Sequence, residues 1–227
     1  MAGSEFSLLR HFLVFALTVF VFFAGISLGA LLNKGQVSAL EEEISFFRET
    51  GEAVQSSSMM ADEFEGELGC EILTSEIYRQ GETLDRISAH LSEYEKSRKF
   101  GESFIVLKEK YISLLARDWL VARKALRQCP GEEKPFETIL YFYTNDNCPS
   151  CTDQGVILDV MKKKFGDRLL IFSLDTDIKS PEAAALKRAF NITEYPSIVI
   201  GKDVFPGFAP KDSVEAALLK GPSLPPA

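Results

Sequence analysis

The sequence predicts an α/β domain of strand–helix order βα-βα-ββα in the C-terminal third, preceded by an α-helical hairpin and a single transmembrane helix. Three observations predict this class: an uncharged N-terminal run, two blocks of apolar residues at helical spacing, and short β-like runs that alternate with helical segments. The expected domains are a transmembrane anchor at residues 1–34, an acidic helical stalk at 35–68, an antiparallel helical hairpin at 69–130, the α/β domain at 136–221 and a Pro-rich tail at 222–227.

The uncharged run Phe12–Leu32 has 21 residues. About 20 apolar residues cross a bilayer core, whereas the apolar region of a signal peptide has about 7–15. Because no small-x-small cleavage site ends the run, a retained anchor is favoured over a cleaved signal. Arg10 before the run and Glu41–Glu43 after it predict a cytoplasmic N-terminus and an extracytoplasmic C-terminal domain. Gly25 and Gly29 match the G-x-x-x-G pattern of helix-dimer contacts, so a homodimer is one alternative for the anchor.

The region from residue 36 to residue 135 is acidic and mostly helical. It holds 13 basic and 20 acidic residues, a balance that argues against nucleic-acid binding. Apolar residues at 3,4 spacing from Val37 to Phe47 continue the membrane helix as an amphipathic or coiled-coil stalk. Ser56–Ser58 are expected to break this helix.

Two apolar seams predict the helical hairpin. The first contains Leu73, Ile77, Leu84, Ile87, Leu91 and Tyr94, and the second contains Ile105, Ile112, Leu115, Trp119, Ala122 and Leu126. A turn at Lys99–Glu102 brings Cys70 and Cys129 level at the far end, since each lies about 30 residues from the turn in helices that rise about 1.5 Å per residue. A structural disulfide between them is favoured over two free core thiols.

The motif Cys148-Pro149-Ser150-Cys151 lies between a β-like run at 138–143 and an expected helix at 152–165. This context places two thiols at a strand-to-helix turn, where the helix dipole and free backbone N–H groups stabilise a thiolate. A thiolate attacks disulfides, and a second thiol three residues on can release the mixed disulfide. The alternatives are a disulfide that only stiffens the loop and half of a zinc site.

The remaining segments complete the βα-βα-ββα order. A buried strand is expected at 167–175, and a helix at 181–190 has Ser180 as its N-cap and a proline at its first position. A proline then opens a strand at 194–200, a hairpin turn follows, and a helix at 210–220 ends the domain.

The C-P-S-C turn, the Tyr195-Pro196 pair that ends 48 residues after Cys148, and the hairpin with the last helix resemble the thioredoxin superfamily. The resemblance covers residues 136–220, somewhat over a third of the chain. It implies that Cys148 is the nucleophile and Cys151 the resolving thiol, and that Pro196 is a cis-proline facing the active site. It also implies that the substrate is contacted by Tyr195, Pro196, Pro149 and Ser150.

Three departures from the family pattern accompany this resemblance. Asn147 stands where thioredoxins usually have a tryptophan, and Phe142 stands where many members have a buried acid. The initial βα unit of a full thioredoxin is missing. Pro149, directly after the first cysteine, is more similar to DsbA-type oxidases and glutaredoxins than to thioredoxin itself.

The sequence therefore predicts a membrane-anchored, extracytoplasmic thiol–disulfide oxidoreductase, and four cysteines suit an oxidising environment. Its expected partners are protein thiols and disulfides and, by family analogy, a membrane redox protein. This interpretation implies no metal or organic cofactor, and a zinc site is disfavoured because the only histidines, His11 and His90, are distant from the motif. The alternative is a non-catalytic membrane-anchored adaptor whose thioredoxin-like domain carries a structural disulfide.

Overall fold

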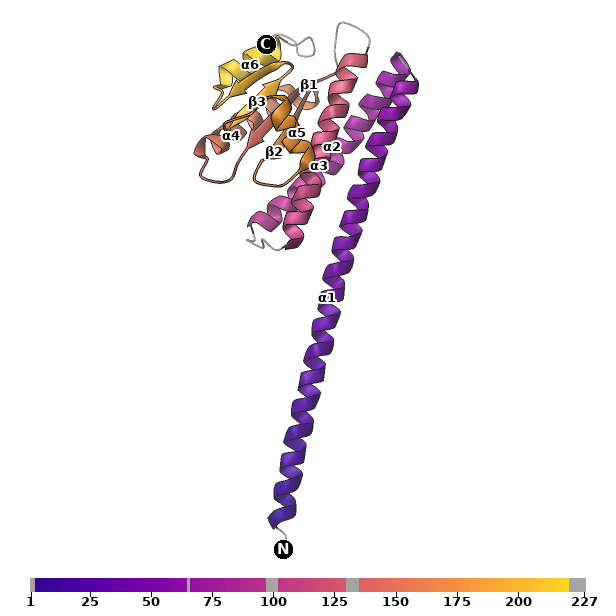
Figure 1. The fold of residues 1–227 in the computed structure, drawn as a ribbon, viewed down its shortest axis with the longest axis vertical. Helices are drawn as coiled ribbons and strands as arrows, with labels where there is room; N and C mark the ends of the chain where they lie inside the picture. The colour runs from indigo at the N-terminus through magenta and orange to yellow at the C-terminus, as the bar shows by residue number, and fades with distance from the viewer. Residues whose placement is uncertain (1–2, 65, 97–101, 130–134, 221–227) are drawn as a thin grey trace. The chain divides into compact units, whose positions relative to one another are not determined.

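The structure of the chain is a computed structural model that describes residues 3–64, 66–96, 102–129 and 135–220 (Figure 1). Within the helices, the backbone alone is described at residues 3–10, 12, 28–44, 90, 93–96 and 102–103. The chain forms two compact units, Met1–Ser45 and Phe46–Ala227.

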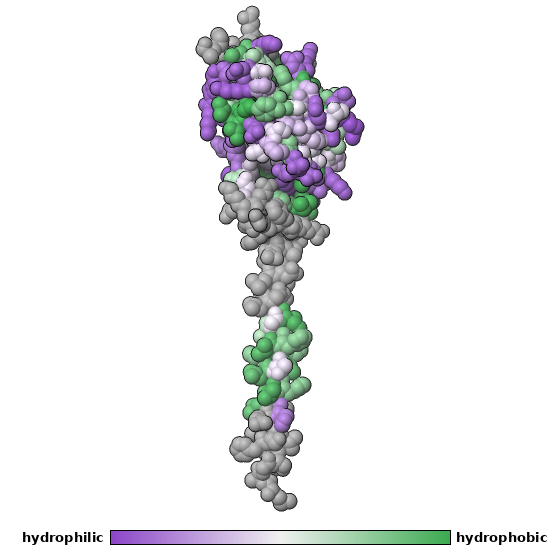
Figure 2. Space-filling model, turned by 90° about the vertical axis from the view of Figure 1, so that its left-hand side faces the viewer, coloured by the Kyte–Doolittle hydropathy of each residue, from purple (hydrophilic) through white to green (hydrophobic). Residues whose placement is uncertain are grey.

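The first unit consists of the N-terminal part of helix α1, which runs from Gly3 to Glu63. Its described apolar side chains are exposed and gather along the helix (Figure 2). In the part of the chain that the structure describes, no helix has an apolar stretch long enough to span a bilayer. This finding corrects the expected transmembrane helix at Phe12–Leu32, and with it the single-pass topology and the extracytoplasmic location.

Gly29 lies outside the described side chains, so a dimer through Gly25 and Gly29 stays a prediction.

The second unit begins with a three-helix bundle made of the last part of α1, α2 (Glu67–Lys96) and α3 (Glu102–Gln128). Helix α1 continues through Ser56–Ser58, where the sequence predicts a break. Its inner face is buried at Val54 and Ala61. The ammonium of Lys124 on α3 donates to the carbonyl and hydroxyl oxygens of Ser58 at 2.5 and 2.9 Å. These contacts make residues 46–63 part of the bundle rather than a solvated stalk.

The turn between α1 and α2 depends on glycine. A Cβ added at Gly69 would lie 2.1 Å from the carbonyl oxygen of Phe64, so any other residue would collide with the backbone there. Gly66 has a φ of +80°, in the left-handed region that favours glycine. Together they let α2 reverse direction directly after α1 ends.

A disulfide joins Cys70, near the start of α2, to Cys129, just after α3, with a Cα–Cα distance of 4.8 Å. The two helices are therefore antiparallel. The seam residues Leu73 and Ile112 are buried, whereas Ile105 is 46% exposed. The predicted turn at Lys99–Glu102 lies largely outside the described residues.

The rest of the second unit is a four-stranded sheet with the strand order β2-β1-β3-β4. Strand β2 is parallel to β1, whereas β3 is antiparallel to both β1 and β4. The strands are β1 (Glu137–Tyr143), β2 (Leu169–Asp175), β3 (Ser197–Ile200) and β4 (Asp203–Pro206); the helices are α4 (Pro149–Phe165), the 3-10 turn η1 (Gly166–Arg168), α5 (Pro181–Ala189) and α6 (Lys211–Leu219). The predicted βα-βα-ββα order is confirmed.

Helices cover both faces of the sheet. Ile139 and Tyr141 of β1 belong to a core with apolar residues of α4 and α6. Leu140 and Phe142, on the opposite face, belong to a core that includes residues of α5 and the bundle. Helix α3 contacts β1, β2 and α5, and it lies beside α5 in Figure 1. The bundle is therefore packed into the sheet rather than forming a separate hairpin domain.

Candidate redox site at the start of helix α4

The C-P-S-C motif forms the N-terminus of α4. The Cys148 and Cys151 sulfur atoms are bonded at 2.01 Å. Helix α4 begins at Pro149, earlier than the predicted start at Thr152, and Cys148 is its N-cap. The Cys148 Sγ accepts a hydrogen bond from the Cys151 backbone N–H at 3.2 Å. Proline suits the first helical position because the N–H group at that position makes no hydrogen bond within the helix. Pro149 therefore loses no helical hydrogen bond.

The two sulfur-bearing residues differ in accessibility. Cys148 is half-buried, whereas Cys151 is only 5% exposed. Around Cys148, Pro149 is exposed and Ser150 is half-buried, with its Oγ 3.6 Å from the Cys148 Sγ. Cys148 is therefore the more accessible residue of the pair. In the reduced pair, the Cys148 sulfur would lie at the positive end of the helix dipole, which stabilises a thiolate.

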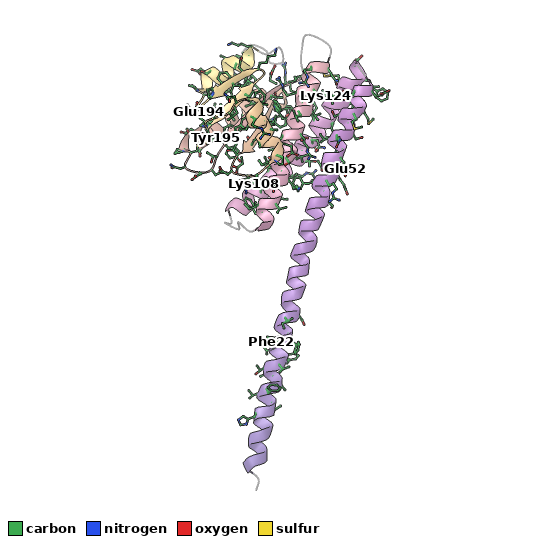
Figure 3. All side chains as sticks on the ribbon, in the orientation of Figure 1. Phe22, Glu52, Lys108, Lys124, Glu194 and Tyr195 are labelled. Carbon is green, nitrogen blue, oxygen red and sulfur yellow. A yellow bond between two sulfur atoms is a disulfide. The ribbon has the colours of Figure 1, made fainter. Side chains whose placement is uncertain are left out.

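The Tyr195–Pro196 peptide bond is cis. Pro196 is buried directly before β3, and the next residue, Ser197, pairs with Phe142 of β1. Strand β1 leads from that same end into the Cys148 turn, so the register brings Pro196 to the end of the sheet that holds the cysteine pair. Tyr195, labelled in Figure 3, is half-buried. Its ring centroid lies 5.0 Å from the Lys187 Nζ.

The turn from β1 to Cys148 is held by two carboxylates at the end of β2. Asp177 accepts hydrogen bonds from the Thr144 hydroxyl at 2.6 Å and from the Asn145 backbone N–H at 2.7 Å. Asp175 accepts a hydrogen bond from the Asn145 side-chain amide at 2.6 Å. Asn147 has a φ of +49°, a left-handed conformation that asparagine adopts more readily than most residues. These contacts fix the backbone that carries Cys148.

Asp175 also binds the bundle. The Lys108 Nζ on α3 lies 2.7 Å from its Oδ2, and the two side chains are 10% and 1% exposed. Lys108 projects from α3, which also carries Lys124 (Figure 3). Removal of one partner from a buried ion pair leaves an uncompensated charge, so the pair is costly to break. The bundle thus positions the redox turn through Lys108, Asp175 and Asn145.

Tyr141 ties the first turn of α4 to the sheet. Its hydroxyl donates to the Cys151 carbonyl oxygen at 2.7 Å. Burial raises the pKa of Tyr141 well above its ordinary value, so the hydroxyl stays protonated and remains a donor. Farther along α4, the Gln154 side-chain carbonyl accepts from the Ala209 backbone N–H at 2.8 Å. These two hydrogen bonds thus hold α4 in place at its N-terminal turn and farther along the helix.

The sequence analysis misses four residues of this site: Lys108, Tyr141, Asp175 and Asp177. The sequence did contain a signal for the two aspartates: Asp175 ends a buried strand and Asp177 lies two residues beyond it, where the carboxyl end of that strand meets that of β1. No sequence signal pointed to Lys108, because a lysine in an amphipathic helix normally faces solvent. Phe142, at the offset where many thioredoxins have a buried acid, is fully buried in the apolar core.

Comparison with protein-family models and with curated proteins finds no match for this chain. Among solved structures, a malarial protein is 24% identical over 38% of this chain and 97% of its own, with a TM-score of 0.33. Thioredoxin-2, a component of the malaria parasite protein secretion machinery, is 25% identical over 38% and 84%, with a TM-score of 0.31. The germline-specific thioredoxin Deadhead of Drosophila melanogaster is 15% identical over 45% and 90%, with a TM-score of 0.35.

The assignment of the fold rests on the chain itself. The sheet order, the cysteine pair at the start of α4 and the cis-proline before β3 occur together in one domain. The C-terminal part of this chain has a thioredoxin-like fold.

Proposed function

We propose that this protein is a thiol–disulfide oxidoreductase that exchanges disulfides with protein partners through Cys148 and Cys151. One observation carries the proposal: an accessible Cys148 at a helix N-terminus is bonded to a buried Cys151. An accessible sulfur suits the bond to a partner, and a buried neighbouring sulfur suits the internal bond that releases the partner.

The exchange has two steps in the oxidising direction. A partner thiolate attacks the Cys148 Sγ, the Cys148–Cys151 bond breaks, and Cys151 leaves as a thiolate that takes a proton from solvent. A second partner thiolate then attacks the partner sulfur of the mixed disulfide, and Cys148 leaves as a thiolate. The partner has lost two electrons and gained a disulfide, while the Cys148–Cys151 pair has gained the two electrons. The reverse sequence reduces a partner disulfide.

Groups around Cys148 stabilise its negative charge and contact the partner during these steps. The Cys151 N–H and the N-terminus of α4 stabilise negative charge on Cys148 when it leaves or attacks. Pro149 and Ser150 offer surface beside the sulfur, and an extended partner segment would contact Tyr195 and the backbone before cis-Pro196. No acid stands at Phe142, so solvent is the proton source and acceptor for Cys151 in this proposal.

Trapping of the mixed disulfide tests the proposal. Cys151→Ser keeps the attacking thiol but removes the resolving one, so incubation with a disulfide-bonded peptide should accumulate a covalent adduct at Cys148. Cys148→Ser should form none. Non-reducing electrophoresis and peptide mass spectrometry detect the adduct, and the double variant Cys70→Ala with Cys129→Ala serves as a control that keeps the motif. Equal absence of adducts in both folded single variants would favour the non-catalytic adaptor with a structural disulfide.

A further inference from the structure

A groove runs along the open edge of the sheet. Strand β2 is the end strand of the sheet and, among the described residues, pairs with β1 alone. Beside it lies a cavity of about 430 Å³, lined by residues of α2, α3 and α4, by Tyr141 and Tyr143 of β1 and by residues 170–173 of β2. Unpaired backbone groups on an edge strand are a template for pairing with another chain. The groove therefore gives an additional strand access to β2.

Two glycines widen the groove. Gly81 of α2 and Gly155 of α4 both line it, and a Cβ added at either would meet no atom within 4 Å. Glycine inside a helix is less favourable than alanine by about 0.5–1 kcal/mol. Here the missing side chains leave space into which another backbone can approach closely.

A buried carboxyl group without a partner also lines the groove. Asp118 of α3 is 3% exposed, and neither carboxyl oxygen has a hydrogen-bond partner among the described atoms. Such buried unsatisfied groups are rare in folded proteins. Asp85 and Asp159 add acidic groups to the lining, whereas the basic lining residue, Lys162, donates its ammonium to two backbone carbonyls at 3.0 and 2.9 Å. The lining therefore favours a basic ligand.

We propose that this groove binds an extended segment of a partner protein, which adds a strand to β2 and places a Lys or Arg side chain against Asp118. Strand addition supplies main-chain hydrogen bonds and the groove supplies specificity for the side chain. Binding of a cation beside Asp118 would release the proton of the buried carboxyl group to solvent and form charge-assisted hydrogen bonds that this group otherwise lacks. This site lies on the β2 edge and uses neither Cys148 nor Pro196, so it goes beyond the proposed function.

A displayed peptide library tests the proposal. The target is the full chain with Cys148→Ser and Cys151→Ser, so that thiol exchange cannot contribute. The probe is a library of nine-residue peptides with Val, Ile or Thr at alternate positions and random residues between them. We expect enrichment of peptides with Lys or Arg at one fixed position. A synthetic copy of an enriched peptide should bind at least tenfold more weakly after N-methylation of the amides that pair with β2.

Variants of the groove give the matched comparison. Gly81→Leu with Gly155→Leu should abolish binding, because the new side chains fill the groove without meeting other atoms at their Cβ positions. Gly25→Leu is the control, since it is also a helical glycine with open space but lies outside this unit. Asp118→Asn should reduce binding tenfold or more and remove the preference for a basic residue. Thermal unfolding checks that each variant is folded.

The same experiment can overturn the proposal. Equal peptide enrichment on the target and on the groove-filled variant, or enrichment without a basic residue, would do so. Hydrogen exchange gives a separate readout: bound peptide should protect the amides of Ile171 and Ser173. Protection near Pro196 instead would assign the peptide to the redox site. A change of oligomeric state on filling the groove would assign it to a second copy of the chain.

Discussion

The Cys70–Cys129 disulfide joins residues 59 apart in the sequence, whereas Cys148–Cys151 joins residues only three apart. In the chain-entropy view, a cross-link stabilises a protein by restricting its unfolded chain, and the effect grows with the length of the closed loop. The Cys70–Cys129 bond is therefore expected to stabilise the fold more than the Cys148–Cys151 bond does. A short-range disulfide that restricts the unfolded chain so little is better placed to break and reform.

The surroundings of the two bonds differ as well: the first bond is buried at Cys129, and the second is accessible at Cys148. Cys129 is 4% exposed at the end of the bundle, beside the Gly69 turn that admits no side chain. Cys148 is half-buried at a helix N-terminus and accepts a backbone hydrogen bond. We expect stability to depend on the first bond and exchange chemistry on the second, and the variants below test this division.

Removal of the long-range bond should have the largest effect on stability. Cys70→Ala with Cys129→Ala should lower the free energy of unfolding by about 4 kcal/mol, and removal of the Cys148–Cys151 bond by about 2 kcal/mol or less. Urea denaturation measures both losses. Equilibration with glutathione should give an unchanged reduction potential for the Cys148–Cys151 pair in the first variant. Equal losses of stability would contradict the division.

Lys108→Met should affect both properties, because Lys108 links the bundle to the redox turn. The substitution leaves Asp175 buried without its cation and should cost about 3 kcal/mol of stability. It should also change the exchange rate of Cys148, since Asp175 holds Asn145. Lys124→Met on the same helix is the control. It also removes two hydrogen bonds to Ser58, but its charge partner Asp62 is 62% exposed, so no buried carboxylate is left unpaired. A smaller loss and an unchanged exchange rate are expected.

Asp118→Asn should flatten the pH dependence of stability. Burial, with a further contribution from Glu76, raises the pKa of Asp118 to about 8, and Arg79 opposes the rise. The folded chain therefore keeps a proton that the unfolded chain loses above its ordinary pKa. Stability is then highest in acid and falls as the pH rises toward 8, by about 1.4 kcal/mol for each unit by which the pKa is raised. Urea denaturation between pH 5 and pH 9 measures the slope; an unchanged slope in the variant would contradict the assignment.

Tyr141→Phe should have the smallest effect on stability, about 1 kcal/mol, because it removes one hydrogen bond to the Cys151 carbonyl. The reduction potential of the pair should shift as well. Tyr111→Phe, which loses a hydrogen bond to Ser88 in the bundle, is the matched control. It should cost a similar amount of stability and leave the potential unchanged. A potential that moves equally in both variants would argue against a specific role for Tyr141.

Local patterns predicted much of the C-terminal domain from the sequence. Alternating strands and helices predicted its element order, and Ser180 was expected to cap a helix that begins at Pro181. The structure has this helix, with the Ser180 Oγ accepting from the Ala183 N–H at 3.2 Å. These predictions were correct because they depend on interactions between residues that are only a few positions apart in the sequence.

The length of the helical hairpin predicted one distant contact, the Cys70–Cys129 disulfide. Other contacts between distant segments could not be predicted from local patterns. The Lys108–Asp175 pair and the packing of α3 on the sheet connect segments that no local period relates. The predicted helix break at Ser56–Ser58 was wrong for the same reason. Lys124, which is distant in the sequence, donates hydrogen bonds to Ser58 and stabilises the helix there. The membrane span was inferred from the length of the uncharged run and from the lack of a cleavage site after it, which are properties of the sequence alone.

Helix α3 belongs to the bundle and also covers one face of the sheet, and this has a practical consequence for dividing the chain. A fragment that starts at residue 136 would contain every strand and both cysteines of the motif. Its sheet face, with Leu140, Phe142, Phe172 and Leu174, would lack the cover that the bundle provides. Such a fragment is expected to aggregate, and transfer of the motif to another protein requires α3 as well. The smallest portable unit is therefore larger than the thioredoxin-like segment alone.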